Sequence, residues 1–80
     1  MSGLPEDFVE RLARVLEPGS RVAAAEIIEA ATRLDDEGLR IFLELFAARV
    51  RASVAPVRSR ELKEFLQTAE RSRGGPPAAP

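Results

Sequence analysis

Cysteine, histidine, tryptophan and tyrosine are all absent from this sequence of 80 residues. Without cysteine the chain can form no disulfide bond, and without cysteine and histidine it lacks the usual ligands of a structural zinc site. Most activated nucleophiles and general bases are also excluded, because enzymes commonly build them from histidine or cysteine. The sequence therefore predicts a protein that is not an enzyme and that holds no cofactor and no metal.

The remaining chemically active side chains have structural interpretations. A catalytic lysine is normally buried, whereas the pattern around Lys63 predicts an exposed helix face. The acidic run of Asp35, Asp36 and Glu37 lacks the alternating ligand positions of a calcium-binding loop and is typical of the first turn of a helix. Neither feature predicts a catalytic or metal site.

Long hydrophobic runs are also missing. No apolar stretch is long enough to cross a membrane, and the acidic Glu6 and Asp7 stand where a signal peptide would carry basic residues. We therefore expect a cytoplasmic protein that makes no contact with a membrane.

Apolar residues recur at intervals of three and four along most of the chain, which is typical of amphipathic helices. The class is therefore all-α: a small bundle of four short helices in one domain, residues 1–72, followed by a disordered Gly/Pro/Ala tail, residues 73–80. Pro18-Gly19 and Pro56 are expected to separate helices. The expected helices are Pro5 to about Glu17, a second that Ser20 caps and that runs to Leu34, Leu39 to about Ser53, and Arg60 to about Arg71 with Ser59 as its cap.

The junction of the second and third helices has two interpretations. Asp35 can cap a new helix, or one helix can run through Gly38, because the apolar spacing continues across it. We favour the break. A continuous helix would leave three helices in a short–long–short layout that resembles histone-fold subunits. In that layout Arg58-Ser59-Arg60-Glu61-Leu62 resembles their second loop leading into the last helix, which implies a nucleic-acid-binding protein.

The expected helix from Leu39 to Ser53 carries apolar residues on two faces. A helix of this kind must be covered on two sides, so we expect it at the centre of the bundle. A domain of this size buries limited apolar surface by itself, and a second copy of the chain is the simplest cover for the second face. The predicted partner interface consists of Ile41, Phe42, Leu45, Phe46, Ala48 and Ala52.

Charge is unevenly distributed along the chain. Residues 1–48 hold ten acidic residues and five arginines, a net charge of −5, whereas residues 49–80 have a net charge of +4. Basic side chains can pair with phosphates, but glutamates are interleaved with them here and no tyrosine or tryptophan could stack on bases. The candidate basic contact surface consists of Arg49, Arg51, Arg58, Arg60 and Lys63.

Together these patterns favour a non-catalytic protein–protein interaction module, such as an adaptor, docking or regulatory subunit. We expect it to form a homodimer through its third helix and to bind a heterologous protein as well. The alternative is a histone-fold-like or other basic nucleic-acid-binding protein.

Overall fold

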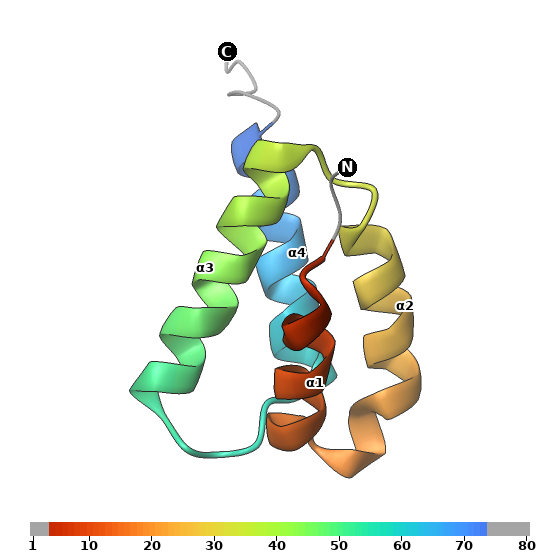
Figure 1. The fold of residues 1–80 in the computed structure, drawn as a ribbon, viewed down its shortest axis with the longest axis vertical. Coiled ribbons are helices and arrows are strands. Elements are labelled where there is room, and N and C mark those ends of the chain that lie inside the picture. Colours follow the sequence, from red (N-terminus) through yellow and green to blue (C-terminus); the bar gives the residue numbers. More distant parts are fainter. Residues whose placement is uncertain (1–3, 74–80) are drawn as a thin grey trace.

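Four helices form a bundle in the computed structural model, which describes residues 4–73 (Figure 1). They are α1 (Glu6–Val15), α2 (Arg21–Ala31), α3 (Asp36–Ala52) and α4 (Ser59–Arg73), and a short 3-10 turn, η1 (Pro18–Ser20), precedes α2. The predicted all-α class with four helices is confirmed. The predicted tail, residues 73–80, lies outside the described residues except for its first, which is the last residue of α4.

Each helix packs between two neighbours around one core. α4 packs against both α3 and α2. On the other side of the bundle, Phe8 of α1 meets Phe46 of α3 edge-on, with the ring centroids 5.0 Å apart, and α1 and α2 line a common groove. α1 therefore lies opposite α4, and α2 lies opposite α3 (Figure 1).

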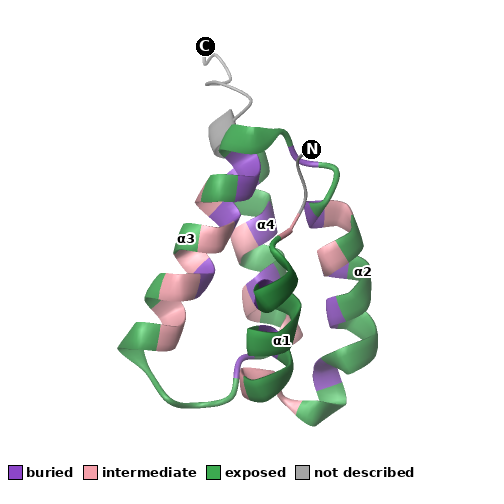
Figure 2. Ribbon diagram, viewed as in Figure 1, coloured by how far each residue is buried: buried purple, intermediate pink, exposed green. Residues whose placement is uncertain are grey.

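Buried residues lie on the helix sides that face the centre of the bundle (Figure 2). The ring of the fully buried Phe42 lies 6.0 Å from that of Phe8. All four helices contribute to this single apolar cluster, so no helix can be removed without exposing it. Its members are Phe8, Leu12, Ala24, Ile27, Ala31, Leu34, Leu39, Phe42, Phe46, Val57, Leu62, Leu66 and Ala69.

The break between α2 and α3 is confirmed. The carboxylate of Asp35 accepts a hydrogen bond from the backbone N–H of Gly38 at 2.8 Å, which caps α3. α2 ends at Ala31, and the chain then crosses the end of the bundle before α3 begins (Figure 1). The short–long–short layout on which the resemblance to histone-fold subunits depended is therefore absent.

Neither serine that was predicted to cap a helix does so. The hydroxyl of Ser20 donates to the carboxylate of Glu17 at 3.4 Å and makes no capping hydrogen bond to α2. α4 begins at Ser59 itself, and the carboxylate of Glu61 accepts the backbone N–H of Arg58 at 3.2 Å. That contact is the half of a capping box in which the third helical residue reaches back to the cap position.

α3 is not the central helix that the sequence predicted. It occupies one corner of the bundle, with α1 on one side and α4 on the other. The prediction was wrong because α4 covers part of the second apolar face of α3, leaving no need for a central position. α3 therefore has a neighbouring helix on two sides, while part of its second apolar face remains exposed.

Candidate functional site

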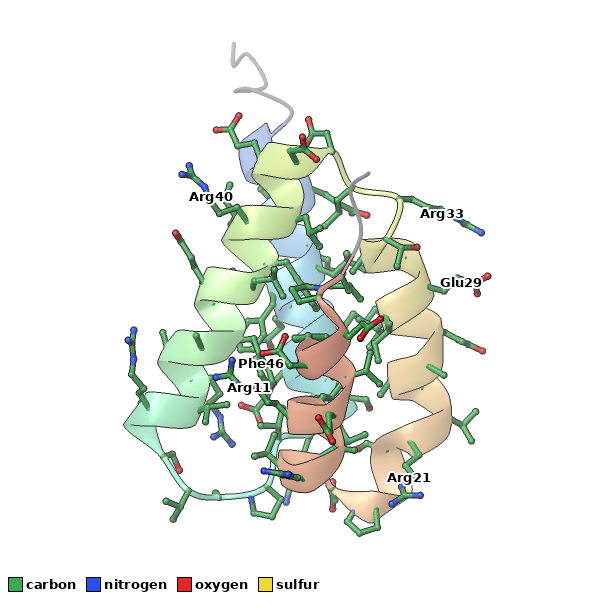
Figure 3. All side chains as sticks on the ribbon, viewed as in Figure 1. Arg11, Arg21, Glu29, Arg33, Arg40 and Phe46 are labelled. Carbon is green, nitrogen blue, oxygen red and sulfur yellow. The ribbon has the colours of Figure 1, made fainter. Side chains whose placement is uncertain are left out.

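The structure divides the predicted partner interface into two parts. Phe42 and Phe46 are buried in the core of the chain itself, where Phe8 covers them from α1 (Figure 3). The other four predicted residues lie toward the outside of α3. Of these, Ile41 and Leu45 are half-buried, whereas Ala48 and Ala52 are exposed.

A more apolar surface lies elsewhere, in the groove between α1 and α2. This α1–α2 groove has a volume of about 270 Å³. Seven of its eight lining residues are apolar, which leaves Arg21 at the lower end of α2 as the one charged side chain (Figure 3). The lining consists of Val9, Leu12, Ala13, Leu16, Arg21, Ala24, Ala25 and Ile28.

A large apolar side chain is unusually exposed in the α1–α2 groove. Val9, within the lining, is 49% exposed. Small side chains lie beside it, because Ala13 and Ala25 are also exposed. Scattered apolar residues are normal on a protein surface, whereas a contiguous apolar groove marks a site of contact.

The outer side of α1 gives the α1–α2 groove an acidic edge. Glu6 and Glu10 lie three residues before and one residue after Val9, and both are exposed. Within residues 4–73, neither glutamate takes part in an ion pair. This edge therefore favours a positively charged ligand.

The amino-acid pattern did not lead us to predict the α1–α2 groove. A signal was present, because Val9, Ala13 and Leu16 lie at helical spacing beside, and not on, the stripe of Phe8 and Leu12. Which neighbour covers such a side stripe depends on the packing of the helices.

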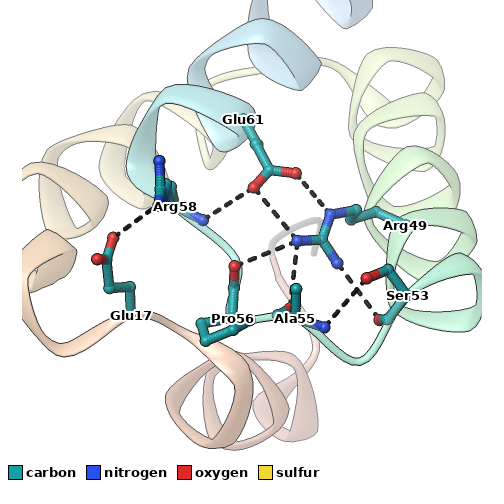
Figure 4. A network of polar contacts seen from close by, with 7 residues as sticks. All are labelled: Glu17, Arg49, Ser53, Ala55, Pro56, Arg58 and Glu61. Atoms are coloured by element: carbon teal, nitrogen blue, oxygen red, sulfur yellow. Dashed lines mark hydrogen bonds and ion pairs between the residues drawn. The ribbon is translucent and has the colours of Figure 1, made fainter.

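The candidate basic contact surface is partly neutralised by glutamates. Arg49, only 17% exposed, donates to both carboxylate oxygens of Glu61 (Figure 4). Its guanidinium also donates to the backbone carbonyls of Ser53, Ala55 and Pro56 at 3.2–3.4 Å. Arg49 therefore holds the α3–α4 loop against the start of α4 and presents little charge to the surface.

The other four basic residues are exposed. Arg58 pairs with Glu17 at 3.6 Å, whereas Arg51, Arg60 and Lys63 make no ion pair within the described part of the chain. Arg51 lies near the end of α3, while Lys63 lies on the side of α4 that faces α2. A shared contact surface of all five residues stays a prediction.

The contact with Arg49 also affects the titration of Glu61. The hydrogen bond from the Arg49 guanidinium holds the pKa of the Glu61 carboxyl below its ordinary value of 4.5. Partial burial acts in the opposite direction, and the backbone N–H of Arg58 again lowers this pKa. Because the folded-state pKa is depressed, the ionised carboxylate stabilises the fold above about pH 4.5, and this stabilisation is lost as the pH falls through the lowered pKa.

We expect Glu61→Gln to lower the melting temperature near neutral pH, because the amide cannot pair with Arg49 as an ion. The difference in melting temperature between the variant and the native protein should narrow as the pH is lowered below about 4.5, because the native carboxylate itself then becomes protonated. Thermal denaturation followed by circular dichroism across this pH range checks the prediction. A difference that stays constant from neutral to acidic pH would show that the charge of Glu61 adds nothing.

Comparisons of the chain with protein-family models, with curated proteins and with solved structures gave no match. Among residues 4–73, no helix has the length and apolar content needed to cross a membrane. The same residues contain no group of three or more carboxylates placed to hold a metal ion. The function therefore has to be inferred from the surface chemistry of the chain itself.

Proposed function

We propose that this chain is a non-catalytic protein–protein interaction module whose α1–α2 groove takes an amphipathic helix of a partner protein. The observation that carries the proposal is the exposure of Val9 in a groove whose lining is apolar apart from Arg21. Covering this surface removes apolar area from water, which is the main favourable contribution to most protein association.

The shape and charge of the α1–α2 groove define the chemistry of the partner. Ala13 and Ala25 leave room for a helix to approach closely, and apolar side chains at positions i, i+3 or i+4 and i+7 of that helix would fill the groove. Glu6 and Glu10 favour lysine or arginine beside that apolar stripe. The expected ligand is therefore a helix with one apolar face and a basic flank.

Selection from a phage-displayed library of amphipathic helices, with randomised polar positions, tests this proposal. We expect the selected peptides to carry an excess of lysine and arginine. In isothermal titration, Val9→Lys should weaken their binding by about tenfold or more, because it replaces apolar surface with a charge and repels the basic flank of the peptide. Val54→Lys is the matched control, since Val54 is an exposed valine outside the α1–α2 groove.

Two outcomes would contradict the proposal. The library could yield no peptide that binds, or the selected peptides could bind the Val9→Lys protein as tightly as the native one. In the second case, mapping the bound peptide by NMR would show which other surface it uses.

Nucleic-acid binding has less support. Two of the five candidate basic residues, Arg49 and Arg58, are paired with glutamates in the chain itself. Binding to phosphates depends on cationic side chains that displace the counterions condensed on the nucleic acid, and an arginine already paired with a glutamate does this poorly. Of the other three, Arg60 lines a pocket with Arg49 and Arg58, whereas Lys63 lies on the side of α4 that faces α2 and Arg51 lies near the end of α3.

A further inference from the structure

We infer that a second copy of this chain packs antiparallel against the outer face of α3, with a two-fold axis passing close to Ala48. Glu44 of each subunit then faces the partner's Arg51. This contact uses none of the residues that line the α1–α2 groove. The dimer and the binding of a partner helix in that groove are therefore independent inferences.

An apolar stripe runs along the proposed contact. Ile41, Leu45, Ala48 and Ala52 recur at intervals of four, three and four residues, which places them on one side of α3. The stripe is roughly 16 Å long at the rise of an α-helix. Its first two members remain half-exposed in the single chain, and its last two are exposed.

α4 widens this stripe. Arg49 of α3 pairs with Glu61 of α4, and the two helices run in opposite directions. One helical turn away from this pair, toward the start of α3 and the end of α4, Leu45 lies level with Phe65. Phe65 is also half-buried. The apolar surface therefore includes a large aromatic side chain besides the residues of α3.

Two charged residues border the stripe and set the direction of the partner. Glu44 and Arg51 are exposed, and neither makes a hydrogen bond or ion pair with another residue in the range 4–73. They are seven residues apart, which is two helical turns, so they lie on the same side of α3.

An antiparallel two-fold contact centred between these residues brings each Glu44 opposite the partner's Arg51, once on each side of the axis. A parallel contact would instead place like charges opposite one another, which is unfavourable. The centre of the antiparallel contact falls beside Ala48, whose small, exposed side chain allows the two helices to approach closely. Charge pattern and side-chain size therefore select the same arrangement.

Charge reversal tests this arrangement. Glu44→Arg alone would place arginine opposite arginine twice, and Arg51→Glu alone would place glutamate opposite glutamate twice. We expect each to raise the dissociation constant of the dimer by about tenfold or more. The double variant Glu44→Arg/Arg51→Glu restores both pairs with the charges exchanged and should return the constant to near its native value. Sedimentation equilibrium of the full chain measures all four proteins.

Glu26→Arg is the matched control, because it makes the same charge change at an exposed position on α2, which lies opposite α3. It should leave the dimer unaffected. Circular dichroism establishes that every variant remains folded. A native protein that stays monomeric at all accessible concentrations would overturn the inference, as would a double variant as weak as the singles. Neither outcome would affect the proposed role of the α1–α2 groove, which the selected peptides test separately.

Discussion

Phe42→Ala should lower the free energy of unfolding by about 3–5 kcal/mol, the usual cost of deleting a large aromatic side chain from a packed core. Phe42 has no exposed surface, and its ring is 6.0 Å from that of Phe8, so the substitution removes contacts between α3 and α1. A domain of this length has a total stability of roughly 4–12 kcal/mol. The substitution should therefore remove a large share of the total stability. Urea denaturation followed by circular dichroism measures the change.

Val54→Ala provides the comparison for this experiment. Val54 is fully exposed in the α3–α4 loop, so its truncation should change the free energy of unfolding by less than about 0.5 kcal/mol. If Phe42→Ala cost no more than Val54→Ala, the packing of α1 on α3 described above would be incorrect.

Val57→Asp should destabilise the protein by about 4 kcal/mol or more, because it places a carboxylate where no solvent reaches. Val57 is fully buried although it lies in the α3–α4 loop. Its backbone N–H donates to the carbonyl of Val15 at 2.7 Å, and its own carbonyl accepts the N–H of Glu17 at 2.8 Å. These bonds fix the loop to the end of α1, so the aspartate cannot move into water without breaking them.

The same substitution three residues earlier in the loop shows whether the loss of stability comes from burying the carboxylate. Val54→Asp changes the same residue type in the same connection between helices, but its side chain points into water. The melting temperature of Val54→Asp should remain near that of the native protein, whereas that of Val57→Asp should fall steeply. Similar melting temperatures for the two variants would mean that the loop is not held against α1.

The sequence determined the local structure of this protein. Apolar spacing, Pro18-Gly19 and Pro56 were enough to predict four helices, and Asp35 with its acidic neighbours marked the start of α3. These signals suffice because helix formation and capping depend on residues within a few positions of one another. The stripe of Phe42 and Phe46 predicted that both side chains would be covered, and the structure shows that Phe8 of the same chain covers them.

Only the tertiary structure decided which apolar faces the chain covers for itself. The predicted second face of α3 is partly covered by α4, while the α1–α2 groove, which the sequence did not single out, remains open around Val9. The sequence also did not reveal the partner of Arg49, because Glu61 lies twelve residues away, on the other side of a loop. Spacing along one helix shows that a face is apolar or charged. What meets that face depends on how the other helices are placed, and this is set by contacts between residues far apart in the chain.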